Sequence, residues 1–311
     1  MRFVVEQRKL TIPVVNPFRL DFTVWALRRR KTNLVDWWDE EKYSRILVFD
    51  NQPVRMSIVQ EGTSRTPNLG LTLSSQKGIS ISTQKEALLI VRKMLGLTVD
   101  LQPFYKLATG NEFLKDLVEV FSGVKPPCFP SFFEALVNSI SCQQVTLDVG
   151  ILMINRLANR FGIKFEIKGV IQYAFPRPED LENATEADIK DLGYSAQKAR
   201  AIKELVQTFL QHNIDLIHLE KMANEQIVQY LTTLRGIGRW SAEYALLRGV
   251  ERLDIFPGDD VGARNNLQRL FHLDEKLNYE EINKLTSQWH PYEGLVNFHL
   301  LLEKLHRQGV I

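Results

Sequence analysis

Apolar and polar positions follow two different rhythms along the chain. In the first hundred residues they alternate with a period of two, which is typical of strands with one buried face. The predicted strands lie at 46–49, at Val54, Met56 and Ile58, at Leu69, Leu71 and Leu73, and at Ile79 and Ile81. A helical pattern covers 22–30, and Thr83-Gln-Lys-Glu86 has the spacing of a capping box that opens a helix over 87–95, stopped by Gly96.

Beyond Gln102-Pro103 the alternation nearly disappears and a period of three to four takes over. The predicted helices are 111–121, 131–143, 146–160, 185–192, 196–211, 224–234, 239–249, 260–270, 279–288 and 292–307. A mixed segment followed by helices alone suggests two domains. We therefore predict a mostly α protein, with an α+β N-terminal domain over 1–103 and an all-helical domain over 104–311.

Composition narrows the class of protein only modestly. The chain has 311 residues, of which 44% are hydrophobic and 24% charged, as in ordinary globular proteins with a core. Its net charge of +2 does not announce a nucleic-acid partner, so any basic face must be local. No apolar run is long enough to span a membrane, and the N-terminus does not resemble a signal peptide, so we expect an intracellular protein.

Cysteines and histidines give little chemistry. Cys128 and Cys142 form neither a disulfide framework nor a metal-ligand spacing, and the six histidines show no ligand motif. The run from Arg28 to Lys31 is conspicuous, but a charge run on a helix is usually a solvated face.

The most informative segment lies between two of the predicted helices. Gly236-Ile-Gly238 predicts a tight hairpin whose backbone N–H groups open the helix over 239–249. Helix N-termini bind phosphate, because free N–H groups and the helix dipole both favour an anion. About twenty residues later, Asp259 and Asp260 follow Phe256-Pro-Gly. Each feature alone is a common turn or helix cap. Their ordered combination suggests a nucleic-acid enzyme that needs one carboxylate.

This combination resembles the helix-hairpin-helix/Gly-Pro-Asp superfamily of base-excision DNA glycosylases. Within it, the chain is most similar to the 3-methyladenine DNA glycosylase II family. The resemblance covers about 105–311 well and the first hundred residues more loosely. It implies a helix-hairpin-helix glycosylase core, with the hairpin element at 224–249 and the Gly/Pro/Asp loop at 256–262.

The resemblance also implies the residue that carries the chemistry. Asp260 matches the aspartate that stabilises positive charge on the sugar as the N-glycosidic bond breaks. Asp259 is then expected to cap the next helix or to orient its neighbour. From the residues alone, the choice between Asp259 and Asp260 as the catalytic residue is close to even. Trp240 stands where bifunctional members have a lysine. Tryptophan cannot form a Schiff base, so strand cleavage is not expected.

Further positions are expected to contact the base and the DNA. Trp240 and Tyr244 share a helix face and, with Leu301, would line the base pocket; a core aromatic stripe is the alternative. Gln143, Gln144 and Val145 match the loop that fills the gap left by a flipped nucleotide, with Gln144 or Val145 as the wedge; solvated caps are the alternative.

Phosphate binding is expected from Gly236, Gly238 and Arg239, with Arg235, Lys198 and Arg264 as further candidate contacts. The resemblance implies a monovalent cation at the backbone carbonyls of Thr232, Leu234 and Ile237. The chain lacks the cysteine ligands of the iron–sulfur cluster found in some members, and no redox or organic cofactor is expected.

The predicted function is a monofunctional DNA glycosylase of base excision repair. It would flip out and hydrolytically remove alkylated purines, of the 3-methyladenine and 7-methylguanine type, from double-stranded DNA, and it would act as a monomer. Two alternatives remain open at this point. One is a glycosylase of the same superfamily for uracil, deaminated or oxidised bases, and the other is a non-catalytic helix-hairpin-helix DNA-binding protein. Localisation to cytoplasm or nucleus depends on the source of the chain.

Overall fold

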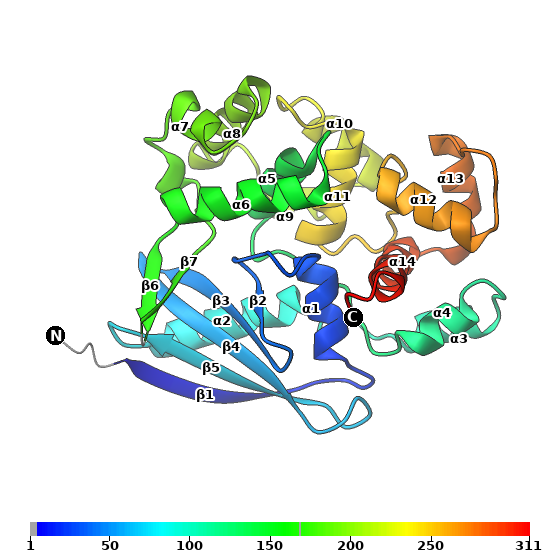
Figure 1. Cartoon of the computed structure of the whole chain (residues 1–311), viewed down its shortest axis with the longest axis horizontal. Helices are drawn as coiled ribbons and strands as arrows, with labels where there is room; N and C mark the ends of the chain where they lie inside the picture. Colours follow the sequence, from blue (N-terminus) through cyan, green and yellow to red (C-terminus); the bar gives the residue numbers. More distant parts are fainter. Residues whose placement is uncertain (1–4, 168) are drawn as a thin grey trace.

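The computed structural model describes residues 5–167 and 169–311 and combines an N-terminal antiparallel sheet with a larger helical part (Figure 1). This confirms the predicted fold class. In chain order the elements are β1 (Glu6–Pro13), α1 (Leu20–Arg28), β2 (Trp37–Trp38), β3 (Lys42–Phe49), β4 (Gln52–Glu61), β5 (Asn68–Ser75), α2 (Ile81–Met94), α3 (Gln102–Thr109), α4 (Lys115–Val120), α5 (Phe132–Cys142), α6 (Leu147–Phe161), β6 (Lys164–Ile167), β7 (Val170–Tyr173), α7 (Glu186–Asp191), α8 (Ala196–Leu210), α9 (Leu216–Leu219), α10 (Asn224–Leu231), α11 (Arg239–Gly249), α12 (Val261–Leu270), α13 (Tyr279–Thr286) and α14 (Glu293–Arg307), with short 3₁₀ turns at Glu179–Leu181 and Ser287–Trp289.

The sheet has the strand order β1-β5-β4-β3-β2, and all its neighbours are antiparallel. Its apolar face packs with α2 and with the helical part in one continuous buried cluster, which runs from Ile12 to Ile255. Side chains at alternate positions of β4 are buried, as the period-two pattern predicts. The same buried cluster contains residues on both sides of the predicted domain boundary near residue 103. It therefore does not test that boundary, which stays a prediction.

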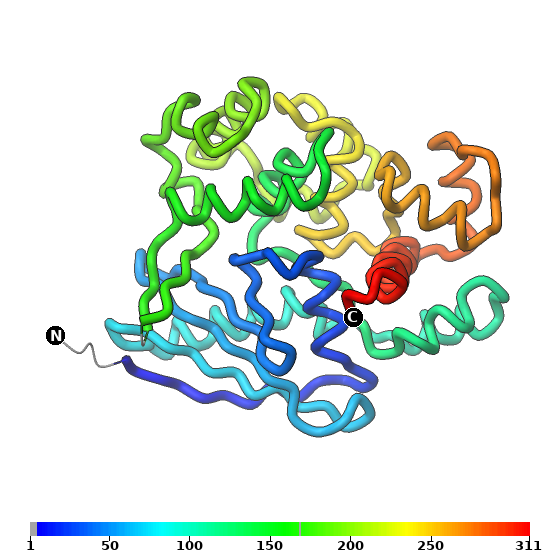
Figure 2. Tube along the Cα trace, viewed as in Figure 1, coloured from blue at the N-terminus to red at the C-terminus, as the bar shows by residue number. Residues whose placement is uncertain are grey.

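Helix α1 is buried on opposite faces by two different cores. Val24 and Leu27 belong to the cluster that contains the sheet, whereas Trp25 and Ala26 belong to a second cluster with α3, α4 and α14. The chain therefore returns at its end to lie beside α1, as the trace shows (Figure 2). Arg29, which directly follows α1, is buried in this arrangement.

A buried polar group also joins the sheet to the helices. Arg45 on β3 is 1% exposed and donates to Asp36, at 2.7 Å, and to both carboxylate oxygens of Glu134 on α5. The hydroxyl of Tyr43 donates to the same Asp36 at 2.6 Å. Since the pairs are out of water, their geometry has to satisfy most of the donors and acceptors involved.

Two expectations for the first hundred residues are wrong. Ile79 and Ile81 form no strand: Ser80 accepts from the backbone N–H of Thr83 at 3.0 Å and caps α2, which begins at Ile81. Two alternating residues are too short a pattern to distinguish a strand from a helix start, and Ile81 is 72% exposed. The cap therefore lies three residues before the predicted capping box at Thr83.

The helical part is not all-helical, which corrects a further prediction. Strands β6 and β7 form a hairpin, and Phe165 of β6 is buried against Ile46 of β3. Gly169 turns the hairpin with a φ of +80°. Strands of four residues with few buried side chains give almost no periodic signal, and this hairpin is therefore invisible to sequence patterns.

Candidate active site and nucleic-acid interface

Asp260 is held in place by two hydrogen bonds at the start of α12. Its Oδ1 accepts from the backbone N–H of Ala263 at 2.8 Å, so Asp260 is the N-cap of the helix. Its Oδ2 accepts from the indole Nε1 of Trp240 at 2.9 Å. The side chain is half-buried. A carboxylate hydrogen-bonded through both oxygens at a helix N-terminus is held in one direction.

The expectation that Asp259 caps this helix is wrong. Asp259 is exposed and pairs with Arg264 at 3.4 Å, while Asp260 has the extended backbone of an N-cap residue. The physical reason is the helix start at Val261, one residue later than a cap at Asp259 requires. Because Asp259 is exposed and outside the capping interaction, it is the natural control residue for Asp260.

The two aromatic residues on α11, Trp240 and Tyr244, differ in how much of their surface is exposed. Trp240 is half-buried, and its ring centroid lies 5.7 Å from that of Tyr244. Tyr244 is 7% exposed and is contacted by the guanidinium groups of Arg29 and Arg248, at 5.7 Å and 5.5 Å from its ring. Trp240 is therefore the member of the pair with exposed surface, and Tyr244 lies below it.

The third residue expected at the base pocket, Leu301, is half-buried on α14. Helix α14 packs against α12, where the side chain of Asn266 donates to the carbonyl of Leu300 at 3.4 Å. Leu301 thus belongs to a helix that contacts the one opened by Asp260. Its part in a pocket stays a prediction.

The hairpin between α10 and α11 uses its two glycines for different reasons. Gly236 has a φ of +75°, and an added Cβ would lie 2.6 Å from the Cβ of Ala201 on α8. Gly238 is the exposed N-cap of α11, and an added Cβ would have no atom within 4 Å. Gly236 is required by the fold, whereas Gly238 leaves open space in front of the helix N-terminus, where an anion can approach the backbone.

The basic side chains near the hairpin are largely engaged within the protein. Arg239 pairs with Glu225 at 3.1 Å and donates to the hydroxyl of Tyr279 at 3.2 Å. Arg235 pairs with Glu204 at 2.8 Å. The backbone N–H groups at the start of α11 are therefore the candidate phosphate contacts of this turn, and their role stays a prediction.

The loop after α5 is tied directly to the hairpin. The amide of Gln143 donates to the carbonyl of Gly236 and to the hydroxyl of Ser241, each at 2.7 Å. The ammonium of Lys198 donates to the carbonyl of Gln143 at 2.6 Å, and burial lowers its pKa. Gln143 and Lys198 are thus internal braces, which sequence patterns did not indicate.

The two residues beyond this brace point outward. Gln144 is exposed with a φ of +52°, and Val145 is 39% exposed. A non-glycine residue in the left-handed region is uncommon and bends the chain here. The bond between Gln143 and Gly236 places this bend beside the hairpin. The loop and hairpin therefore form one continuous edge of the molecule.

The first two residues of the run from Arg28 to Lys31 do not form a solvated face, which corrects another expectation, whereas Lys31 is exposed. Arg28 and Arg29 are buried, because α1 is enclosed by two cores. Arg28 donates to the carbonyls of Lys31 and Trp38, at 2.7 and 3.3 Å, and it is therefore structural. Arg29 reaches Tyr244, a contact that sequence reasoning missed. The available signal was that the run follows a helix with apolar residues on every side, Val24 to Leu27.

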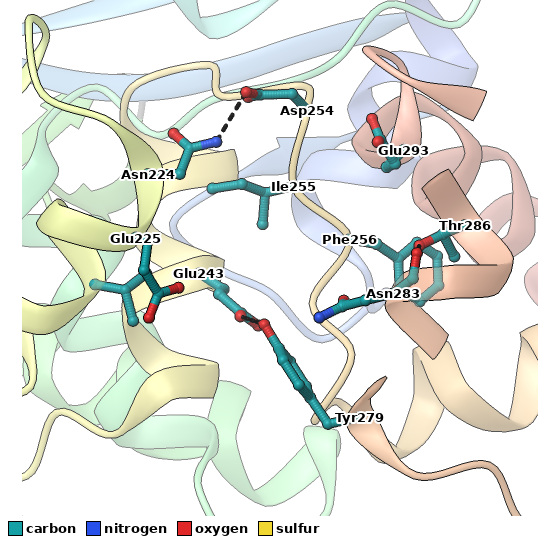
Figure 3. Close-up of a pocket in the computed structure, with 11 residues that line it drawn as sticks. Asn224, Glu225, Glu243, Asp254, Ile255, Phe256, Tyr279, Asn283, Thr286 and Glu293 are labelled. Carbon is teal, nitrogen blue, oxygen red and sulfur yellow. Dashed lines mark hydrogen bonds between the residues drawn. The ribbon is translucent and has the colours of Figure 1, made fainter. Parts of the chain in front are cut away.

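A cavity of about 230 Å³ lies between α10, α11, the segment 254–256, α13 and the start of α14 (Figure 3). Four carboxyl groups line it, those of Glu225, Glu243, Asp254 and Glu293. Burial raises the pKa of Glu243 to about 7, and the hydroxyl of Tyr279 donates to it. This acidic cavity is unsuited to a phosphate, and neither Asp260 nor Trp240 lines it.

Residues 5–167 and 169–311 contain neither a candidate metal cluster nor a helix suited to a membrane. Among them, no group of three or more histidine, cysteine or acidic residues is placed to hold a metal ion. In the same described ranges, no helix is both long and apolar enough to cross a membrane.

Comparisons with known proteins show which proteins this chain is similar to. Residues 137–291 match the profile of the HhH-GPD superfamily of base excision DNA repair proteins, a stretch that holds the 143–145 loop, the hairpin and Asp260. A protein of Bacillus subtilis named DNA-3-methyladenine glycosylase is 26% identical over 228 residues, covering 73% of this chain and 75% of the relative.

Solved structures extend the likeness to the whole fold. A 3-methyladenine DNA glycosylase from Archaeoglobus fulgidus superposes with a TM-score of 0.84 at 22% identity, covering 96% of this chain and 98% of that one. A Clostridium acetobutylicum 8-oxoguanine glycosylase/lyase, in complex with double-stranded DNA, has a TM-score of 0.76 at 17% identity, covering 99% and 100%. The N-terminal sheet is therefore part of the shared fold.

Proposed function

We propose that this chain, which belongs to the HhH-GPD superfamily of base excision DNA repair proteins, is a monofunctional DNA glycosylase that removes alkylated purines from double-stranded DNA. The name of the Bacillus subtilis relative supports the choice of substrate. The observation that carries the proposal is the carboxylate of Asp260, held by Trp240 and by the start of α12, in the same unit as an anion-binding hairpin. A purely DNA-binding module needs no such carboxylate.

Asp260 has the position and the charge to assist cleavage of an N-glycosidic bond. Bond breaking develops positive charge on the sugar, and a carboxylate fixed in a half-buried site stabilises it. The same group is able to orient the attacking water. Because Asp260 is already hydrogen-bonded through both oxygens, little reorganisation is needed when the charge develops.

Hydrolysis without strand cleavage follows from Trp240. A lyase step needs an amine that attacks the sugar and forms a Schiff base. The residue beside Asp260 is instead a tryptophan, and its indole N–H donates a hydrogen bond to that carboxylate. The expected products are a free base and an intact strand with an abasic site. The half-exposed ring of Trp240 offers a surface on which a flipped base would stack.

The edge formed by the hairpin and the 143–145 loop is the proposed DNA interface. Backbone N–H groups at Gly238 and Arg239 would hold a phosphate, and Gln144 or Val145 would enter the space left by the flipped nucleotide. The hairpin also fits a monovalent cation. Its carbonyls are hard oxygen donors, and in the described residues those of Thr232 and Ile237 take no part in the hydrogen bonds of the turn. Leu234 would add a third carbonyl, although it already accepts from Ile237.

When bound, such a cation would supply positive charge to an adjacent phosphate. The test is the affinity of the protein for an undamaged duplex in potassium chloride compared with choline chloride at the same ionic strength. Weaker binding in choline supports the cation, and equal binding opposes it. We propose that the protein needs no redox or organic cofactor and acts as a monomer.

The experiment for the reaction is release of free bases from methylated DNA, followed by chromatography. We expect 3-methyladenine and 7-methylguanine in the supernatant and alkali-labile but uncut strands. Sodium borohydride added during the reaction should trap no covalent adduct. Preferred release of uracil or 8-oxoguanine from lesion duplexes would replace the alkylated-purine assignment. Tight duplex binding with no release from any lesion would leave a DNA-binding protein without chemistry.

A further inference from the structure

The guanidinium of Arg29, from the N-terminal part of the chain, lies among side chains of the helices that carry the proposed active site. Arg29 follows α1 in the left-handed region, with a φ of +61°, and is 6% exposed. Its Nη2 donates to Oδ1 of Asn138 at 3.1 Å, and its Nη1 lies 3.9 Å from the sulfur of Cys142. Its guanidinium carbon is 5.7 Å from the ring centre of Tyr244. Three elements that are distant in sequence therefore meet at one buried cation.

Arg29 is connected to the proposed catalytic carboxylate through two side chains. Asp260 accepts from Trp240 at 2.9 Å, and the rings of Trp240 and Tyr244 lie 5.7 Å apart. Tyr244 is in turn the side chain against which Arg29 packs. On its other side Arg29 contacts Cys142, the last residue of α5 before the 143–145 loop of the proposed DNA interface. The cation thus lies between the two halves of the proposed site.

Two hydrogen-bond donors at this point have no acceptor. The Nε of Arg29 and the hydroxyl of Tyr244 are both buried and, among the residues the structure describes, neither has a partner. Burial raises the pKa of Tyr244, so its hydroxyl keeps its proton. A second guanidinium, that of Arg248, lies 5.5 Å from the same ring. Buried donors without partners are costly, and a ligand with acceptor atoms or negative charge would satisfy them.

We propose that Arg29 determines which bases are removed, by favouring bases that are uncharged before cleavage over bases that carry a positive charge. This inference rests on the proposed glycosylase function and assigns a specificity role to a residue outside the hairpin and the Gly/Pro/Asp loop. Among alkylated purines, Arg29 would favour cleavage of adducts that stay neutral over cleavage of N-methylated bases that are cationic.

The direction follows from where charge moves in the reaction. The bond between C1′ and the base nitrogen breaks, and its electron pair leaves with the base. Water forms the new bond to C1′ and loses its proton to solvent by way of Asp260. A neutral base therefore departs as an anion, which takes up a proton from solvent. The cation of Arg29 and the hydroxyl of Tyr244 stabilise that developing negative charge.

A cationic base behaves in the opposite way. It carries positive charge when it binds, keeps part of it in the transition state, and becomes neutral only after departure. Arg29 repels that charge from binding through the transition state, which lowers kcat/KM for the cationic base. Removal of the charge should therefore move the two kcat/KM values in opposite directions. A merely structural role of Arg29 would lower both.

The test compares 7-methylguanine, which is cationic, with 1,N6-ethenoadenine, which is neutral, in the same duplex sequence. For Arg29→Met we expect kcat/KM to fall for the neutral base and rise for the cationic base. The ratio should change by roughly tenfold or more, the size expected when one charge is removed from a low-dielectric protein interior. Arg29→Lys keeps the charge and should keep most of the wild-type ratio.

Arg28→Met is the matched control, because it removes a neighbouring buried arginine that bonds only to backbone carbonyls. It should leave the ratio unchanged. If Arg29→Met does not fold, Arg29→Gln carries the same expectation and keeps a donor for Asn138. Equal losses on both bases, or a changed ratio in Arg29→Lys, would overturn this inference alone. No release of either base by the wild-type protein would overturn the proposed function, and this inference with it.

Discussion

Replacing Arg45 by methionine tests whether the sheet and the helices depend on their buried ion pairs. Arg45 is 1% exposed and is shared by Asp36 and Glu134, so the substitution strands two carboxyl groups in the core with little change of volume. Removal of one partner of a buried pair costs about 3–5 kcal/mol. We expect a loss of that size in the free energy of unfolding, measured by urea titration with circular dichroism.

The same variant should make stability depend on pH in a stated direction. Burial already raises the pKa of Glu134 to about 7, while Arg45 lowers it. Without Arg45 this pKa rises further, and each additional unit is worth about 1.4 kcal/mol once the pH is above it. Because the folded protein then prefers the protonated acid, its stability falls as pH rises above the unfolded pKa. The cost of Arg45→Met should be larger at pH 8 than at pH 5.

A double variant and a surface variant are the controls for Arg45→Met. Arg45→Met with Glu134→Leu removes one of the stranded acids and should recover part of the lost stability, with a coupling energy of about 1–3 kcal/mol. Arg8→Met breaks an exposed strand pair with Glu6, in which Arg8 is 54% exposed, and should cost less than about 1 kcal/mol. A cost for Arg45→Met no larger than that of Arg8→Met would refute the argument.

Three further predictions follow from single residues. Gly236→Ala should lower the free energy of unfolding by about 1–3 kcal/mol, because its φ is +75° and a Cβ would lie 2.6 Å from a side chain of α8; Gly238→Ala should leave unfolding unchanged but weaken duplex binding in a titration. Burial lowers the pKa of His299 to about 4, so its contribution to stability is complete above pH 6.5 and declines as pH falls toward 4. That contribution is at most about 3 kcal/mol, and His299→Leu should flatten the pH profile of urea unfolding. Trp240→Phe removes a hydrogen-bond donor to Asp260 and should slow single-turnover base release about tenfold, since one such hydrogen bond is worth about 1–2 kcal/mol. An unchanged rate would show that this hydrogen bond does not contribute to base release.

Sequence patterns predicted the long helices well because their signal is local. Ser131 accepts from the backbone N–H of Glu134 and opens α5, and the Gly236 turn separates α10 from α11 as expected. Caps, turns and a stripe of apolar residues all act within a few residues of one another. The fold class could be predicted for the same reason.

Contacts between distant segments could not be predicted in this way. The position of Arg29 against Tyr244 depends on α1 being enclosed by two cores, which no local pattern encodes. The cap at Asp260 depends on one residue of register at the start of α12. The bond from Gln143 to Gly236 joins positions 93 residues apart. Each of these is a property of packing rather than of periodicity.

The carboxylate of Asp260 is the centre of the account, and Asp260→Asn tests it most directly. Asparagine is an equally good N-cap, so α12 and the fold should persist while the charge is lost. The measurement is the single-turnover rate of base release from a 7-methylguanine duplex by wild type, Asp260→Asn and Asp259→Asn. We predict a loss of about 100-fold or more for Asp260→Asn and a near-normal rate for Asp259→Asn. A near-normal rate for Asp260→Asn, with release lost in Asp259→Asn, would contradict the account.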